Sequence, residues 1–162
     1  MHKKQLIYIM GAGRSGTTAL SAFLGNNNNI QNIGEIHQLL DYLDENKECS
    51  CGSLLNECDF WSKRLSKELL QLTFETRDFS NRFESHFSIL KHLFKLFNKK
   101  EIAEYKRLHS KIFKQLALYN DKAVLLDSSK YIGRGLSLNK LEDLDLKVIY
   151  VAIIKPTCPM TT

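Results

Sequence analysis

The sequence predicts a three-layer α/β fold built on a parallel sheet. An apolar β-like run enters a glycine-rich loop followed by an apolar helix, β-like runs return twice near the carboxyl end, and a long helical stretch lies between them. Strands that alternate with helices in this way are typical of parallel sheets covered by helices. We therefore expect a single domain, residues 1–162, with a helical insertion at about 60–120.

The composition is that of an ordinary globular domain. The chain has 162 residues, of which 43% are hydrophobic and 25% charged, so it is long enough to bury a core. The net charge of +5 comes from lysines and arginines scattered over helix-like segments, which predicts a solvated helix surface and no nucleic-acid partner. Neither a secretory signal nor an apolar run of about 20 residues is visible, so we expect a cytoplasmic protein without a membrane anchor.

The first elements follow from their apolar patterns. Residues 6–10 form a short apolar run that ends at a glycine, which predicts a strand buried on both faces. A helix is expected over 17–24, with Leu20, Phe23 and Leu24 on its inward face. An asparagine run then ends this helix.

The middle of the chain is predicted to be helical. Residues 35–44 indicate a short helix, and from residue 60 to 119 two apolar stripes with a helical period predict two or three more helices. Both stripes are expected in the core. They consist of Phe83, Phe87, Leu90, Phe94 and Phe97, and of Ile102, Tyr105, Leu108, Ile112, Leu116 and Tyr119.

The β signal returns at residues 123–127, and the polar residues 128–130 after it are expected to form a loop. A brief helix near 136–141 and a third strand at 147–154 follow. Beyond that strand the chain contains both of its prolines and no helix to cover the strand. We therefore expect the fold to be incomplete at its carboxyl end.

The loop between the first strand and the first helix has the chemistry of an anion site. Residues 11–18 read GAGRSGTT, and a glycine loop before a helix presents main-chain N–H groups and the positive end of the helix dipole to an anion. Arg14 adds a forked cation, and Ser15, Thr17 and Thr18 add hydroxyl donors. This pattern predicts a site for a phosphate or a phosphate-like ester.

Two other phosphate-binding patterns overlap with this loop. The dinucleotide fingerprint G-x-G-x-x-G is matched from Gly11, with Glu35 near the position of its ribose-binding acid. That fingerprint expects a strand to end at the acid, and residues 30–34 are too short and polar to predict one. The loop of nucleoside-triphosphate enzymes is matched by its glycines, but Thr17 stands where its lysine should be, which disfavours ATP hydrolysis.

The variant Gly13-Arg14-Ser15-Gly16-Thr17-Thr18 resembles the 5′-phosphosulfate loop of sulfotransferases that use 3′-phosphoadenosine 5′-phosphosulfate (PAPS). Gly34-Glu35 looks like the segment that carries a catalytic glutamate in the carbohydrate and tyrosyl branches, and Asp127-Ser128-Ser129-Lys130 looks like a later strand-end segment. Cys51-Gly52 and Cys58-Asp59-Phe60-Trp61 are similar to a stretch of bacterial members.

The resemblance implies a P-loop-type fold and sulfuryl transfer from PAPS, as co-substrate, to a hydroxyl or amino group of a small-molecule or carbohydrate acceptor. Glu35 would accept the proton of the acceptor, and Lys130 would reach the bridging oxygen of the leaving adenosine bisphosphate. The scheme requires no metal. The residues that would hold the 5′-phosphosulfate are Gly13, Arg14, Ser15, Gly16, Thr17 and Thr18.

One segment departs from the family pattern. Family members usually follow the third strand with an Arg-Asp-Pro-Arg-like segment that grips the adenosine 3′-phosphate, and here residues 152–156 read AIIKP. Two alternatives therefore stand beside the sulfotransferase. One is a non-catalytic remnant that binds adenosine phosphate weakly or not at all, and the other is a P-loop enzyme similar to a nucleotide kinase.

Three of the four cysteines lie close together in the sequence. Cys49, Cys51 and Cys58 offer soft metal ligands, with His37 as a conceivable fourth, but the spacing is not that of common zinc ribbons or fingers. We expect reduced cysteines that pack a loop anchored by the aromatic residues after Cys58. Three histidines in helical surroundings are expected at surface or half-buried positions: His86, His92 and His109.

Overall fold

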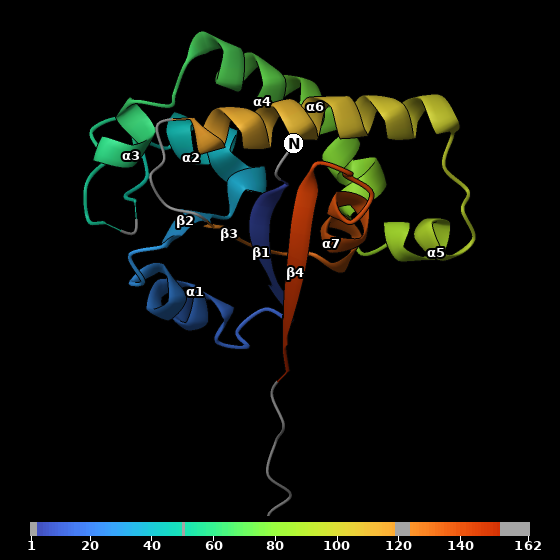
Figure 1. The fold of residues 1–162 in the computed structure, drawn as a ribbon, viewed down its shortest axis with the longest axis horizontal. Helices are drawn as coiled ribbons and strands as arrows, with labels where there is room; N and C mark the ends of the chain where they lie inside the picture. Colours follow the sequence, from blue (N-terminus) through green and yellow to red (C-terminus); the bar gives the residue numbers. More distant parts are fainter. Residues whose placement is uncertain (1–2, 50, 119–123, 153–162) are drawn as a thin grey trace, which may run out of the picture.

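The computed structural model describes residues 3–49, 51–118 and 124–152, and it has an α/β architecture around a four-stranded, all-parallel sheet (Figure 1). The strand order is β2-β3-β1-β4. The strands are β1 (Lys4–Gly11), β2 (Ile30–Gly34), β3 (Val124–Lys130) and β4 (Leu144–Val151). The predicted α/β class and parallel sheet are confirmed.

The central strand is the one expected from its apolar run. β1 pairs with both β3 and β4, and Leu6, Tyr8 and Ile9 are fully buried because side chains on both of its faces are covered. β4 begins three residues before the predicted start at 147. Its predicted end at residue 154 lies outside the described residues, as does residue 123, the predicted start of the preceding strand.

The prediction was wrong for residues 30–34, which form strand β2. This strand lies at the sheet edge and pairs with β3 alone, so polar side chains are tolerated there. The Asn32 side chain donates to the Ser21 carbonyl at 3.1 Å and accepts from the Gly34 N–H at 2.9 Å. The prediction of a loop over 128–130 was also wrong, since β3 continues to Lys130.

Helix α1 (Thr17–Gly25) follows β1 and packs against β1, β2 and β3. Its inward face differs from the prediction: Thr17 and Ser21 are buried, whereas Phe23 is 73% exposed. Small side chains on the inward face let this helix approach the sheet closely. The helix predicted over 35–44 is divided into the 3₁₀ turn η1 (Ile36–Gln38) and helix α2 (Leu39–Asp44).

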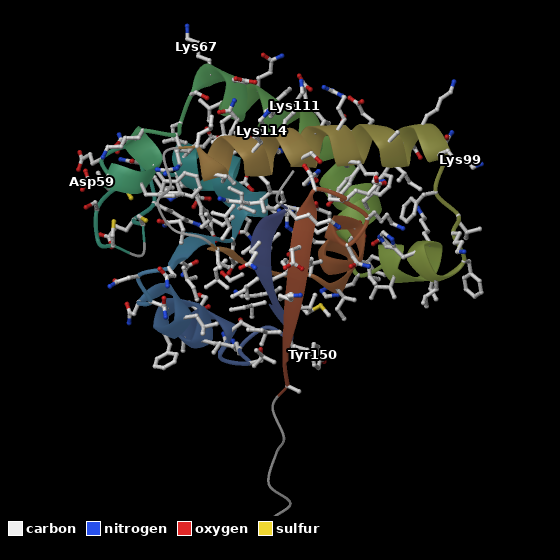
Figure 2. The ribbon with its side chains drawn as sticks, in the orientation of Figure 1. Asp59, Lys67, Lys99, Lys111, Lys114 and Tyr150 are labelled. Carbon is white, nitrogen blue, oxygen red and sulfur yellow. The ribbon has the colours of Figure 1, made fainter. Side chains whose placement is uncertain are left out.

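A group of helices lies between α2 and β3 in the chain. These are α3 (Asp59–Ser62), α4 (Lys67–Phe79), the π-helical turn η2 (Ser80–Glu84), α5 (Ser88–Leu93) and α6 (Lys99–Ala117). The lysines of α4 and α6 that Figure 2 labels are exposed, as expected for a solvated helix surface. The labelled ones are Lys67, Lys99, Lys111 and Lys114.

Of the two apolar stripes, the second is confirmed. Tyr105, Leu108 and Leu116 of α6 are buried, whereas residue 119 lies outside the described part. The first stripe is confirmed only at its two ends: Phe83 is buried and Phe97 packs against the core, whereas Phe87 is 91% exposed and Phe94 is also exposed. The π-helical turn and the short α5 interrupt the helix there, so residues at a constant helical spacing do not share one face.

Helix α7 (Ile132–Leu138) connects β3 to β4 and begins four residues before the predicted position. It contacts β1 and β4, η2 and α5, and therefore joins the sheet to the helical group. Within the described ranges, no helix combines the length and the apolar character needed to cross a membrane.

Candidate functional site

Three segments that the sequence singled out meet at one edge of the sheet. In a parallel sheet the carboxyl ends of the strands lie at the same edge, where ligands of open α/β sheets bind. The glycine loop follows β1, Glu35 follows β2, and Lys130 ends β3. Met10 pairs with Lys130 in the sheet register, so Lys130 lies beside the start of the glycine loop.

The glycine loop leaves the amino end of α1 open. Gly16 is the N-cap residue with a φ of 86°, and no side chain caps the first turn of the helix. Arg14 also has a positive φ of 63°, and the Ser15 N–H donates to the Ala12 carbonyl at 3.2 Å. Backbone N–H groups in such a turn, followed by an uncapped helix, form a concave donor surface that suits an anion.

Ser15 supplies a second, independent sign of a ligand in the loop. The residue is only 8% exposed, and its buried Oγ has no hydrogen-bond partner in the described part of the chain. A Cβ at Gly11 would lie 3.0 Å from this Oγ and 2.6 Å from the Val151 carbonyl oxygen, so the backbone needs glycine there. A buried hydroxyl without a partner is costly, and an anion oxygen in the loop would satisfy it.

The remaining loop residues surround this position. Gly13, Arg14 and Thr18 are exposed and Thr17 is buried. Arg14 makes no hydrogen bond or ion pair with any residue whose structure is described, so its guanidinium is available to a ligand. The loop residues predicted from the sequence therefore lie together around one uncapped helix end.

Glu35 and Lys130, which the sequence suggested separately, form an ion pair. The Lys130 Nζ donates to the Glu35 Oε1, and the two side chains are 27% and 20% exposed. Glu35 lies just before η1, and Lys130 has a positive φ of 70° at the end of β3. A carboxylate and an ammonium group are thus held together, partly accessible, at the edge that carries the glycine loop.

A pocket of about 180 Å³ extends from Glu35 to the first turn of α1. Its lining includes Glu35, Thr18 at the start of α1, Ser128 of β3 and the indole of Trp61. The lining therefore combines polar groups with an aromatic ring, which suits a small polar molecule with an apolar part.

A larger pocket of about 380 Å³ lies beyond η1, and His37, Tyr131 and Arg134 contribute to its lining. Both ring nitrogens of His37 are buried without a hydrogen-bond partner among the described residues, and its ring packs edge-on against Tyr131. Burial, reinforced by the Arg134 charge, lowers the pKa of His37 below its ordinary value.

Beneath the site lies a buried charge network that sequence reasoning missed. The Arg134 guanidinium donates to Asp127 Oδ2 at 3.1 Å through Nε and to Glu84 Oε1 at 2.6 Å through Nη1. Glu84 also accepts from the Tyr105 hydroxyl at 2.8 Å, and His109 Nε2 lies 3.1 Å from it. The network joins β3, α7, η2 and α6, and so it fixes the helical group to the sheet.

The ionic state of this network follows from its geometry. Burial raises the pKa of the Glu84 carboxyl, but Arg134 and the hydrogen bond from His109 outweigh burial and hold that pKa well below its usual range.

His109 and His92 are buried, in contrast to the prediction. His92 Nε2 lies 2.9 Å from the Phe83 carbonyl oxygen, and burial lowers its pKa.

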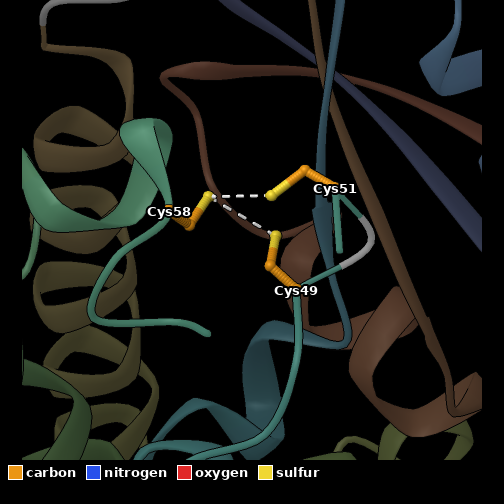
Figure 3. Close-up of side chains that lie close together, drawn as sticks. All are labelled: Cys49, Cys51 and Cys58. Atoms are coloured by element: carbon orange, nitrogen blue, oxygen red, sulfur yellow. Dashed lines mark hydrogen bonds between the residues drawn. The ribbon is translucent and has the colours of Figure 1, made fainter. Parts of the chain in front are cut away.

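The three clustered cysteines meet in space (Figure 3). The Cys58 sulfur lies 3.5 Å from that of Cys49 and 3.6 Å from that of Cys51. Burial raises the pKa of the Cys58 thiol to about 11, and a main-chain hydrogen bond from Ser53 lowers that of Cys51. Cys49 also lines the smaller pocket. His37 is not part of this cluster.

Comparison of the chain with protein-family models, with curated proteins and with solved structures found no match.

Proposed function

We propose that the chain is a PAPS-dependent sulfotransferase, which moves a sulfuryl group to a hydroxyl or amino acceptor. The observation that carries the proposal is the position of the Glu35–Lys130 pair beside a glycine loop that contains an unpartnered, buried Ser15 hydroxyl. Such an edge offers donors for an anionic ester and a carboxylate for the acceptor's proton.

The arrangement of the sheet supports a three-layer, P-loop-type fold. The chain leaves β1 toward β2 and leaves β3 in the opposite direction toward β4, so the loops after β1 and β3 diverge. If both crossovers are right-handed, as almost all are, α1 and α7 would lie on opposite faces of the sheet, as a three-layer fold requires. The crevice between diverging loops is the usual ligand position in open α/β sheets, and here it lies between the glycine loop and Lys130.

The strand order argues against the dinucleotide alternative. In the dinucleotide-binding order 3-2-1-4, the strand that ends at the ribose-binding acid is the neighbour of the first strand. Here β3 separates β2 from β1, so Glu35 at the end of β2 pairs with Lys130 of β3. The acid therefore has a cationic partner of its own. The triphosphate alternative is disfavoured by Thr17, which stands where the loop lysine is required.

In the proposed reaction the loop holds the 5′-phosphosulfate of the donor. Main-chain N–H groups at the start of α1, the Ser15 hydroxyl and the Arg14 guanidinium would neutralise charge on the sulfuryl group during its transfer. Preorganised donors of this kind usually make the largest contribution to the rate.

Glu35 and Lys130 have complementary roles in this reaction. The acceptor oxygen or nitrogen attacks sulfur while the bond from sulfur to the bridging oxygen breaks, and the acceptor's proton passes to the Glu35 carboxylate. Lys130 stabilises the negative charge that develops on the leaving adenosine bisphosphate. Donor binding would draw Lys130 toward the bridging oxygen and release Glu35 for the acceptor. The pocket of about 180 Å³ beside Glu35 is the proposed acceptor position.

Calorimetric titration of the purified chain with 3′,5′-adenosine bisphosphate, with ATP and NAD as comparison ligands, tests the donor site. Selective binding of the bisphosphate supports the proposal. Selective binding of ATP or of NAD favours the corresponding alternative. If a folded chain binds none of the three, the proposal fails and the non-catalytic remnant is favoured.

A further inference from the structure

The three cysteine sulfurs are spaced as ligands of one metal ion. Thiolates about 2.3 Å from a tetrahedral zinc ion lie about 3.8 Å from one another. Two of the three sulfur pairs here are separated by 3.5 and 3.6 Å, and the ligand atoms of Cys49, Cys51 and Cys58 all lie within 4.8 Å of one another. A small shift of the three side chains would bring each sulfur to about 2.3 Å from one shared metal ion.

The backbone around the cysteines brings the sulfurs together from two directions. Cys49 and Cys51 lie in a tight turn, which is closed by hydrogen bonds from the Cys49 N–H to the Ser53 carbonyl at 2.8 Å and from the Gly52 N–H to the Cys49 carbonyl at 2.9 Å. Cys58 reaches the turn from the amino end of α3 (Figure 3).

A main-chain donor beside Cys51 and a cation near Cys58 would offset part of the charge of metal-bound thiolates. The main-chain N–H of Ser53 donates to the Cys51 sulfur. The buried Arg64 guanidinium interacts electrostatically with Cys58. Partners of this kind orient metal-bound ligands and offset their charge.

We propose that Cys49, Cys51 and Cys58 bind one thiophilic divalent metal ion, of which zinc is the representative, as three thiolates. Each thiol releases its proton to solvent when the metal binds. Within the described residues the cluster contains three ligands, so water or an added small ligand would occupy the fourth position. The proposal is independent of sulfuryl transfer.

A bound metal ion would stabilise one wall of the smaller pocket. The segment that carries the cysteines has little regular structure of its own, and its Cys49, Glu48 and Leu55 line the same pocket as Glu35. A metal joined to both the turn and the start of α3 would hold this wall in place. Its removal should therefore loosen the wall beside the candidate site.

A disulfide is the competing chemistry for these sulfurs. It requires a sulfur–sulfur distance of about 2.05 Å, and it would pair two of the sulfurs and leave the third alone. Cys58 is nearly equidistant from the other two, which favours a shared metal over one selected pair. A disulfide lowers the mass of the intact chain by two hydrogens, so the two chemistries are readily distinguished.

To test the proposal, the full chain is reduced, freed of metal by a chelator and then titrated with Co²⁺ and Zn²⁺. We expect one equivalent of Co²⁺ to produce the thiolate charge-transfer and tetrahedral d–d absorption, Zn²⁺ to displace it, and bound Zn²⁺ to protect the exposed Cys51 from alkylation. Absence of the charge-transfer absorption, or a disulfide in the freshly purified chain, would overturn the proposal.

Two variants separate the site from nonspecific thiol binding. Cys51→Ser changes an exposed side chain, so the fold should be retained, and the affinity for Zn²⁺ should fall more than about a hundredfold, since changes in outer partners alone cost about 10–100-fold. Cys158→Ser, outside the described residues, is the matched control and should bind Zn²⁺ as the unmodified chain does. Unchanged affinity in Cys51→Ser, or lost affinity in Cys158→Ser, would contradict the three-thiolate site.

Discussion

The Lys130 ammonium donates to the Glu35 carboxylate across 95 positions of sequence, and the contact exists because β2 and β3 are neighbours in the sheet. Lys130 is the last residue of β3, and Glu35 directly follows the last residue of β2. The pair is partly exposed, so it contributes little to stability, typically about 0–1 kcal/mol. A weak, accessible ion pair of this kind is suited to the role proposed for it in the reaction, because its loss should cost the fold little.

Replacement of Glu35 by glutamine should therefore separate chemistry from folding. We expect Glu35→Gln to abolish sulfuryl transfer, because an amide cannot accept the acceptor's proton, while 3′,5′-adenosine bisphosphate binding and the denaturation midpoint remain nearly unchanged. Transfer is measured with labelled PAPS, and binding by calorimetry. Glu101→Gln, on the exposed surface of α6, is the control and should leave transfer intact. Retained turnover in Glu35→Gln would assign the base to another residue.

Arg14 offers a direct test of the anion loop. Its side chain is exposed and makes no ion pair within the described ranges, so Arg14→Ala should not affect folding. Loss of one charged hydrogen bond should weaken binding of 3′,5′-adenosine bisphosphate by about 1.5–3 kcal/mol. Calorimetry measures the change, and Arg107→Ala, which removes a cation from the exposed face of α6, should have no effect. Equal affinities for both variants would remove the loop from the donor site.

Features decided by neighbouring residues could be predicted from the sequence. The run at 6–10 is apolar at every position, so a central strand was expected, and β1 confirms it. Helix α6 keeps one apolar face along its length, and its stripe is buried as predicted. The glycine loop was recognised because its residue types are contiguous in the chain.

Features decided by distant residues could not be predicted in this way. β2 can be polar because it lies at the sheet edge, where its main-chain hydrogen bonds go to β3, so its residues resemble a turn in the sequence. Arg134 and Glu84 look like surface charges in the sequence, and only the fold brings them together across 50 positions. The candidate site was similarly predicted as separate residues, whereas the Glu35–Lys130 contact depends on strand order.

The buried network should be sensitive to loss of Glu84. In Glu84→Gln the Arg134 charge stays buried with only Asp127 to balance it, and breaking a buried pair from one side typically costs about 3–5 kcal/mol. Urea denaturation should show this as a lower free energy of unfolding. Glu142→Gln removes one partner of an exposed ion pair, with Lys106, and should cost less than about 1 kcal/mol. Similar losses in the two variants would contradict the role given to the network.

At Gly133, α7 lies directly against the segment that joins η2 to α5. A Cβ there would lie 2.3 Å from the Ser88 Oγ and 2.5 Å from the Ser85 carbonyl oxygen. Gly133→Ala should therefore lower the free energy of unfolding by about 1–3 kcal/mol, the usual range for overpacking. Gly13→Ala is the matched control, because a Cβ at Gly13 has no neighbour within 4 Å, and its stability should change little. Denaturant titration of both variants checks the contrast.

The buried His37 should make the free energy of unfolding depend on pH. Burial lowers its pKa in the folded chain below the ordinary value of 6.5, so the unfolded chain binds the proton more readily. The stability that arises from this difference in pKa is therefore fully present above about pH 6.5, and it is lost as the pH falls toward the pKa of His37 in the folded chain. His37→Phe keeps the ring beside Tyr131 and removes this titration, so between about pH 6.5 and 5 its free energy of unfolding should fall less steeply than that of the unmodified chain.

The exposed His86 provides the control for this measurement. Its ring also packs edge-on against Tyr131, but the residue lies at the surface, so His86→Phe should leave the acid dependence unchanged. Urea denaturation at a series of pH values compares the three chains. Some acid sensitivity should remain in both variants, because burial also lowers the pKa of His92. An unaltered pH slope in His37→Phe would mean that His37 is protonated as readily in the folded chain as in the unfolded one.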